Sequence, residues 1–294
     1  MNTTQLRFAS NRMRDIERRM HQELDPCYSA EEVSAMIALL VEAYLGWDRT
    51  QWLLHRDSTV NQSDMLRFHW AMEALRDYRP IQYIIGSTSF CGCHIDVDER
   101  VLIPRPETAE MVENLIALRG AVPAQSVLDL CTGSGCIAIA LASNLPQSRV
   151  TAVDISAAAL ALAEHNAAVN GVAVTFLCDD VLAGAKQVGG RYDLIVSNPP
   201  YVRESERQAM SRNVLDYEPS LALFVPDDDA LCFYSAIASV ALRCLSPDGL
   251  LAVEINEALA DETCALFLKQ GLVPVVHSDY RGRARWITAA PTQR

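Results

Sequence analysis

The stretch Val127-Leu128-Asp129-Leu130-Cys131-Thr132-Gly133-Ser134-Gly135-Cys136 decides the fold. Residues 126–130 are mostly apolar and predict a short buried strand, and the apolar run 136–144 predicts a helix. The two glycines between them let the backbone turn tightly and pass close to a ligand. A strand that enters a helix through a Gly-x-Gly turn is typical of an α/β fold that binds its ligand at that turn.

Strand-like and helix-like segments alternate on both sides of this loop. The predicted strands are residues 126–130, 150–153, 174–178, 194–197, 250–255, 272–277 and 285–289. The predicted helices are residues 136–144, 157–170, 233–244 and 258–270. This alternation predicts a parallel, doubly wound α/β sheet with helices on both faces. Ligands of such sheets bind at the carboxyl ends of the strands.

The N-terminal part of the chain has a different pattern. Ser29 followed by Glu32 is a capping-box signal, apolar residues then recur at helical spacing, and Gly46 stands where a helix would end. We predict a helical bundle over residues 1–78, a β-hairpin linker over 79–103, where apolar and polar residues alternate, and the α/β domain over 104–294.

Composition narrows the class of partner. The 294 residues carry a formal net charge of −12, which disfavours a polyanion such as nucleic acid. No apolar run is long enough to span a bilayer, and the N-terminus lacks the apolar core of a signal peptide. The nine cysteines include no C-x-x-C pair, so no metal site is predicted. We expect a cytoplasmic protein that binds no membrane.

An acidic residue follows the next predicted strand. Asp154 stands 19 residues after Gly135, where a carboxylate can accept hydrogen bonds from a ribose diol. Asp179 and Asp180 end the third strand, near where an adenine amino group would lie. Loop and acid together indicate a nucleoside cofactor, either NAD or S-adenosylmethionine.

The tetrapeptide Asn198-Pro199-Pro200-Tyr201 distinguishes these cofactors. An amide nitrogen is a poor nucleophile because its lone pair is delocalised, so it must be oriented toward an electrophilic methyl group. The Asn198 side-chain oxygen and the Pro199 carbonyl can each accept one N–H of an NH2 group. The prolines hold this geometry rigid, and Tyr201 offers a flat face for a planar group. A dehydrogenase would leave this motif unexplained, so we predict transfer of a methyl group to a planar nitrogen.

The motifs together resemble a known family. The Asp-x-x-Thr-Gly-x-Gly loop with Asn-Pro-Pro-Tyr is similar to amino-methyltransferases, and Leu102-Ile103-Pro104-Arg105-Pro106-Glu107-Thr108 looks like the protein-glutamine N5-methyltransferases. The resemblance implies a Rossmann-like class I methyltransferase fold with a seven-stranded mixed sheet and an N-terminal helical bundle that recognises the substrate. It also implies S-adenosyl-L-methionine as cofactor, with S-adenosyl-L-homocysteine as product, and a monomer.

Two branches of that family remain open. One methylates the glutamine of the Gly-Gly-Gln motif in class 1 peptide chain release factors, and the other a glutamine of ribosomal protein L3. Pro106-Glu107-Thr108 and Asp279-Tyr280 favour the release-factor branch. Phe90-Cys91-Gly92 and Cys131 resemble the L3 branch, because release-factor enzymes usually carry Gly where Cys131 stands. We favour the release factor; a nucleic-acid amino-methyltransferase is a more remote alternative.

The resemblance also implies roles for individual residues. The cofactor would lie against Cys131, Thr132, Gly133, Ser134 and Gly135, with Asp154 on the ribose and Asp180 and Val181 beside the adenine. Asn198, Pro199, Pro200 and Tyr201 would hold the substrate glutamine, with Asn198 also touching the cofactor. Arg105 and Thr108 would line the cofactor pocket. Glu218 would support the substrate side, or would form an interdomain ion pair with Arg105.

Overall fold

The computed structural model describes Phe8 and residues 10–122, 125–145 and 147–292. The chain forms two compact units. One comprises Met1–Gly86 together with Arg212–Tyr217, and the other comprises Ser87–Ser211 with Glu218–Arg294. The first unit is therefore built from two separate stretches of the chain.

The first unit is helical. Its elements are α1 (Met13–Leu24), α2 (Ala30–Leu45), α3 (Arg49–Leu54), α4 (Gln62–Arg76), α5 (Ile81–Ile85) and α9 (Arg212–Leu215). The predicted capping box is confirmed, since Ser29 accepts from the Glu32 amide and the Glu32 side chain accepts from the Ser29 amide. Gly46 closes α2 with a φ of 67°. The apolar faces of α1, α2 and α4 form the core of this unit.

The stretch Arg212–Tyr217 is attached to this unit by specific contacts. The Tyr217 hydroxyl donates to the Asp77 carbonyl at 2.8 Å, and the Arg212 guanidinium lies 4.5 Å from the centre of the Tyr78 ring. Helix α5 was not predicted, because it lies in the segment 79–103 that was expected to form a β-hairpin linker, and a proline such as Pro80 often ends helical structure. Pro80 instead caps the beginning of α5, a position that needs no backbone N–H.

The second unit contains the predicted seven-stranded mixed sheet. Its strands are β3 (Ser126–Leu130), β4 (Arg149–Asp154), β5 (Val174–Cys178), β6 (Tyr192–Ser197), β9 (Leu245–Glu254), β10 (Leu272–Ser278) and β11 (Ala284–Pro291). Their order is β10-β11-β9-β6-β3-β4-β5, and only β11 runs antiparallel to its neighbours. Strands β3 and β6 are almost entirely buried, as expected for strands covered on both faces.

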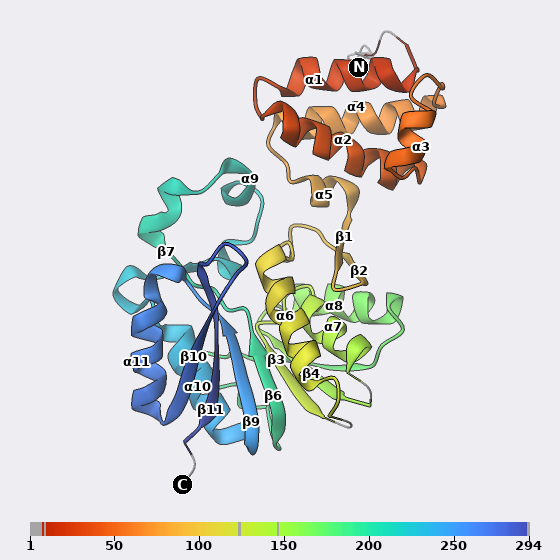
Figure 1. The fold of residues 1–294 in the computed structure, drawn as a ribbon. Coiled ribbons are helices and arrows are strands. Elements are labelled where there is room, and N and C mark those ends of the chain that lie inside the picture. The colour runs from red at the N-terminus through yellow and green to blue at the C-terminus, as the bar shows by residue number, and fades with distance from the viewer. Residues whose placement is uncertain (1–7, 9, 123–124, 146, 293–294) are drawn as a thin grey trace. The chain divides into compact units, whose positions relative to one another are not determined.

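Helices cover both faces of the sheet (Figure 1). They are α6 (Pro106–Arg119), α7 (Cys136–Asn144), α8 (Ala157–Val169), α10 (Cys232–Cys244) and α11 (Ala260–Gln270). The chain passes from β3 to β4 and β5 in one direction, and from β6 to β9 in the other. Right-handed crossovers therefore place α7 and α8 on one face and α10 on the other. The direction changes between β3 and β6, which is where such sheets bind ligands.

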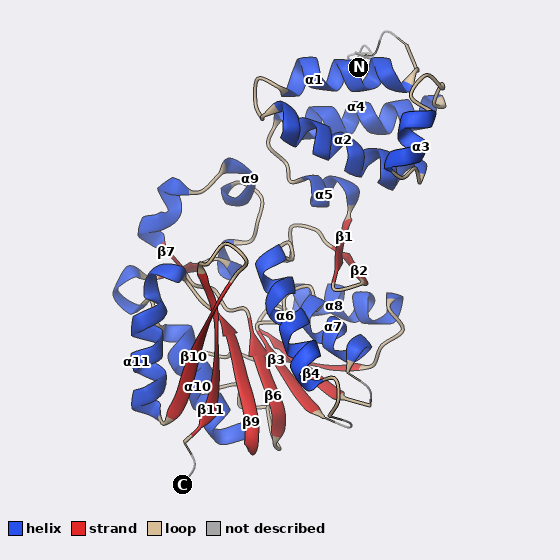
Figure 2. Ribbon diagram, in the orientation of Figure 1, coloured by secondary structure: helices blue, strands red, loops and turns tan. Residues whose placement is uncertain are grey.

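Smaller elements complete this unit (Figure 2). The antiparallel hairpin of β1 (Ser87–Phe90) and β2 (Cys93–Asp96) precedes the sheet, and β7 (Val202–Arg203) pairs with β8 (Phe224–Val225). Short 3-10 helices span Glu204–Ala209, Ser220–Ala222, Asp227–Asp229 and Glu257–Leu259. The described residues include no helix long and apolar enough to cross a membrane. All nine cysteines are free, and Cys178 is exposed.

Candidate active site

The glycine loop between β3 and α7 is tightly shaped. Gly133 and Gly135 have φ values of 55° and 80°, which favour glycine. A Cβ on Gly135 would lie 3.0 Å from Ala163 Cβ and 3.1 Å from Ile139 Cδ1. Gly135 therefore allows both the turn and the close approach of α8. Cys131 also has a positive φ of 60°, a conformation that costs a non-glycine residue energy.

The buried carboxylate of Asp129, in β3, anchors this loop by hydrogen bonds. One oxygen of Asp129 accepts from the Thr132 hydroxyl at 2.6 Å and from the Ala138 amide at 3.2 Å. Burial raises the pKa of Asp129 to about 7. The side chain thus ties the loop to the first turn of α7.

Asp154 is the last residue of β4 and forms a hydrogen bond with the glycine loop. Its two oxygens accept from the Gly133 amide at 2.8 Å and the Ser156 amide at 2.9 Å. Burial raises the pKa of Asp154. Each carboxylate oxygen has two lone-pair directions, so Asp154 can still accept from a ligand diol.

The Asn-Pro-Pro-Tyr motif follows β6, the neighbour of β3. Asn198 Nδ2 donates to Thr108 Oγ1 at 3.0 Å, and Thr108 donates to Glu254 Oε2 at 2.5 Å. The Tyr201 hydroxyl donates to Glu254 Oε1 at 2.9 Å. The neighbouring Glu254 carboxylate raises the pKa of Tyr201, so this hydroxyl keeps its proton. The Ser197 hydroxyl donates to the Leu130 carbonyl at 2.7 Å and so links the last residues of β6 and β3.

One cavity joins the glycine loop to this motif at the carboxyl edge of the sheet. Of the predicted site residues, those that line it are Arg105, Thr108, Cys131, Thr132, Gly133, Ser134, Asp154, Asp180, Val181, Asn198 and Pro200. Gly135, Pro199 and Tyr201 support the wall without lining it. Sequence reasoning missed the apolar Ile155, Leu182, Leu221 and Phe233, which also line it.

Glu254 is a second feature that sequence reasoning missed. It ends β9 and is 3% exposed, directly behind the cavity wall. Its place at the end of a predicted strand, at the same edge as Asn198, was the available signal.

Arg105 and Glu218 form an ion pair of 2.6 Å within this one unit. Glu218 also accepts from the Ile103 amide at 3.2 Å, so its buried carboxylate fixes the segment that precedes α6. The pair is therefore internal to the unit rather than an interdomain contact.

The charges of the wall distinguish the nucleoside cofactors. Asp154, Asp179 and Asp180 line the cavity, while its two arginines are paired, Arg100 with Asp98 and Arg105 with Glu218. Among the described residues that line the cavity, no unpaired arginine or lysine offsets these carboxylates, so the wall favours a cationic ligand over an anionic one. A cationic sulfonium cofactor with a ribose diol and a flat purine fits the acids and the apolar residues of the same wall.

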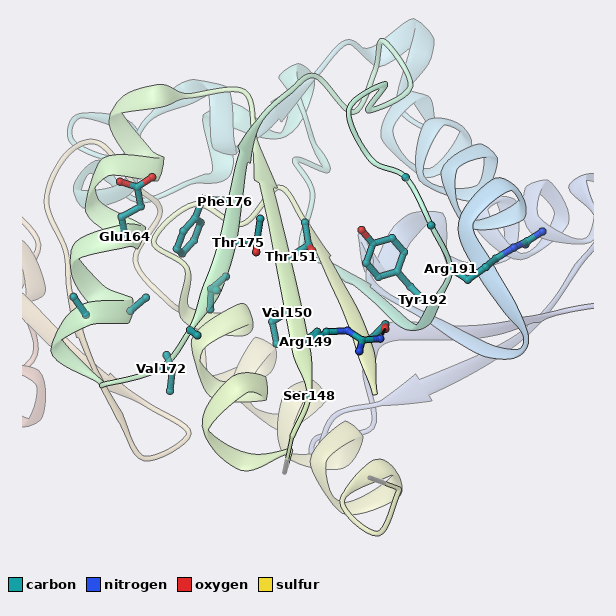
Figure 3. Close-up of a pocket in the computed structure, with 17 residues that line it drawn as sticks. Ser148, Arg149, Val150, Thr151, Glu164, Val172, Thr175, Phe176, Arg191 and Tyr192 are labelled. Carbon is teal, nitrogen blue, oxygen red and sulfur yellow. Dashed lines mark hydrogen bonds between the residues drawn. The ribbon is translucent and has the colours of Figure 1, made fainter. Parts of the chain in front are cut away.

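A second hollow lies at the opposite edge of the sheet (Figure 3). It is lined by the first residues of β3, β4, β5 and β6, including Arg149, Thr151, Thr175 and Tyr192. None of the predicted site residues lines it. The predicted site residues therefore gather at the cavity of the carboxyl edge and not at this hollow.

The fold and this cavity define a class I S-adenosylmethionine-dependent methyltransferase. Residues 90–217 match the family model of the methyltransferase small domain, and residues 16–86 match that of the PrmC N-terminal domain. A methyltransferase structure from Pyrococcus furiosus shares the fold, with a TM-score of 0.51 and 17% identity over 69% of this chain and 90% of that one.

Curated relatives cover most of the chain. The release factor glutamine methyltransferase of Bacteroides thetaiotaomicron is 41% identical over 94% of this chain and 99% of its own length. That of Flavobacterium psychrophilum is 41% identical over 84% of this chain and 88% of its own length. The chain belongs to the release factor glutamine methyltransferase family.

Proposed function

We propose that this enzyme methylates the side-chain amide nitrogen, N5, of the glutamine in the Gly-Gly-Gln motif of class 1 peptide chain release factors. The proposal depends mainly on one observation: Asn198 lines the same cavity as the glycine loop. The relatives named above are release factor glutamine methyltransferases, which supports a release factor as the protein substrate.

The proposed cofactor is S-adenosyl-L-methionine, which supplies an electrophilic methyl group. Asp154 would accept from its ribose hydroxyls, and Thr132 to Ser134 would face its ribose and methionine parts. Ile155 and Leu182 are about half exposed on the cavity wall and would contact the adenine, with Asp180 and Val181 beside them. Arg105, just before α6, and Thr108, in its first turn, would line another side of the cofactor pocket.

The proposed role of the motif is to orient the substrate. The substrate amide has two N–H donors, and Asn198 Oδ1 and the Pro199 carbonyl would accept one each. This arrangement fixes the plane of the amide so that the nitrogen lone pair faces the methyl group. Orientation of this kind can supply most of the rate enhancement without a strong base.

We further propose that the helical unit recognises the protein substrate. Leu53, Leu54 and Trp70 are more than half exposed there, although large apolar side chains are usually buried. Their replacement by serine should raise the KM for the release factor and leave the Kd of the cofactor unchanged.

The proposal is tested by methyl transfer from labelled S-adenosylmethionine to a purified release factor. We expect label on the intact factor and none on a factor whose Gly-Gly-Gln glutamine is replaced by alanine. Asn198→Ala should abolish transfer while the cofactor still binds. Asn144 is exposed at the end of α7, so Asn144→Ala should change neither. Labelling of ribosomal protein L3 or DNA, with the release factor blank, would contradict the proposal.

A further inference from the structure

The carboxylate of Glu254 lies behind the substrate motif and receives two hydroxyl groups. Thr108 donates to one of its oxygens and Tyr201 to the other. Glu254 is buried, and its contacts lie between the end of β9, the first turn of α6 and the loop after β6. A buried acid in this position needs a reason, because burial of a carboxylate is costly.

The directions of these hydrogen bonds are fixed by chemistry. As long as Glu254 is ionised, its carboxylate can only accept, so the Thr108 hydroxyl donates its single proton to Glu254. The lone pairs of Thr108 can then only accept, and Asn198 meets them with its Nδ2 group at 3.0 Å. The Asn198 amide is thereby held with its oxygen turned away from Thr108. Among the described residues, none donates to that oxygen.

We propose that Glu254 is a positioning residue that sets the orientation of the Asn198 amide through Thr108 and so reserves Asn198 Oδ1 for the N–H of the substrate. This inference rests on the proposed function, since it explains how Asn198 presents an acceptor and not a donor. Without Glu254, the Thr108 hydroxyl is free to donate to Asn198 Oδ1. The Asn198 amide then turns and presents N–H groups, which cannot bind the N–H of an amide substrate.

The orientation of the Asn198 amide should depend on pH, because Glu254 can be protonated. The titratable and charged groups that face Glu254 are Tyr201, Tyr234, Glu107 and Arg285. Burial has the largest effect and raises the pKa of Glu254, and the Glu107 carboxylate raises it further. The hydrogen bonds from Thr108 and Tyr201 lower this pKa, as does the charge of Arg285. Protonated Glu254 can donate to Thr108 Oγ1, which leaves the Thr108 hydroxyl free to donate to Asn198 Oδ1. The orientation of the Asn198 amide that suits the substrate is therefore lost as the pH falls through the pKa of Glu254.

The test compares Glu254→Leu with Glu257→Gln, an exposed acid three residues further along the chain. Leucine has a similar volume, and apolar replacement of a buried charge is often tolerated. We expect kcat/KM for the release factor to fall at least about tenfold in Glu254→Leu, the effect of about one hydrogen bond. The Kd of the cofactor should stay within about threefold, and Glu257→Gln should match the wild type.

The pH profile separates positioning from simple support of the fold. With cofactor saturating, the wild type should lose kcat/KM on the acid side, and Glu254→Leu should lack that limb. Asp129 and Asp154 also have raised pKa values. Both are present in the wild type and in Glu254→Leu, so any loss of kcat/KM that they cause appears in both profiles, and only the difference between the profiles reports on Glu254.

A second pair of variants tests the relay without Glu254→Leu. Thr108→Val should lose a similar factor, and Thr108→Ser should restore most of it. Where Glu254→Leu folds, adding Thr108→Val to it should cost little more. A wild type that leaves the release factor unmethylated refutes the proposed function. A wild type that methylates it, with the Thr108→Val variant or a folded Glu254→Leu variant fully active at every pH, refutes the role of Glu254.

Discussion

Replacement of Gly135 by alanine tests how the glycine loop is built. Alanine at a φ of 80° costs about 1 kcal/mol in the left-handed region. Its methyl group would also stand 3.0 Å from Ala163 Cβ and 3.1 Å from Ile139 Cδ1, closer than such atoms normally pack. Overpacking of this kind costs about 1–3 kcal/mol. We therefore expect the free energy of unfolding of the second unit, which contains the seven-stranded sheet, to fall by about 2–4 kcal/mol.

Gly171→Ala is the matched control. Gly171 has a φ of 67°, but a methyl group added there would have no neighbouring atom within 4 Å, so only the backbone cost of about 1 kcal/mol applies. Native-state hydrogen exchange of the buried β3 and β6 amides measures the unfolding of this unit without a signal from the helical one. Calorimetric titration gives the Kd of the cofactor, which should rise only in Gly135→Ala. Equal losses in the two variants would refute the packing role of Gly135.

Three further changes probe charges around the cavity. Asp154→Asn should weaken cofactor binding about 10- to 100-fold by titration calorimetry, because a charged acceptor is lost, while exposed Glu164→Gln should not. The pKa of Asp129 in the folded protein, about 7, lies above its unfolded value. The folded state therefore binds a proton that the unfolded state does not, and the free energy of unfolding rises as the pH falls from about 7 to 4. Urea unfolding of Asp129→Asn should lack this dependence on pH. Arg105→Met should destabilise the protein by about 2 kcal/mol, since it strands the buried Glu218 carboxylate, and Glu218→Gln added to it should recover part of the loss.

Much of the fold could be predicted because its strands are short, apolar and bounded by turns. The structure places strands at 126–130 and 174–178 as predicted, since each has a glycine-rich or acidic boundary. Helix α6 was missed, since no helix was predicted between residue 104 and the strand at 126–130. Pro106 in fact occupies the first turn of α6, where a missing N–H costs nothing.

The site could be predicted only as far as local motifs reach. The glycine loop and Asn198 lie at strand ends, so their meeting at one edge follows from the parallel sheet. Glu254 has no motif around it, and its importance depends on Thr108, which is 146 residues away in the chain. Contacts over such distances are set by side-chain packing and cannot be read from spacing.

The discontinuous helical unit has a consequence for how the protein is made. Its last piece, Arg212–Tyr217, is synthesised after most of the parallel sheet, so the bundle cannot complete its packing while its own first 86 residues emerge. Tyr78 and the Asp77 carbonyl gain their contacts with Arg212 and Tyr217 only after the ribosome has passed residue 217. A chimaera that exchanges the N-terminal bundle with that of a relative must therefore exchange this second piece as well.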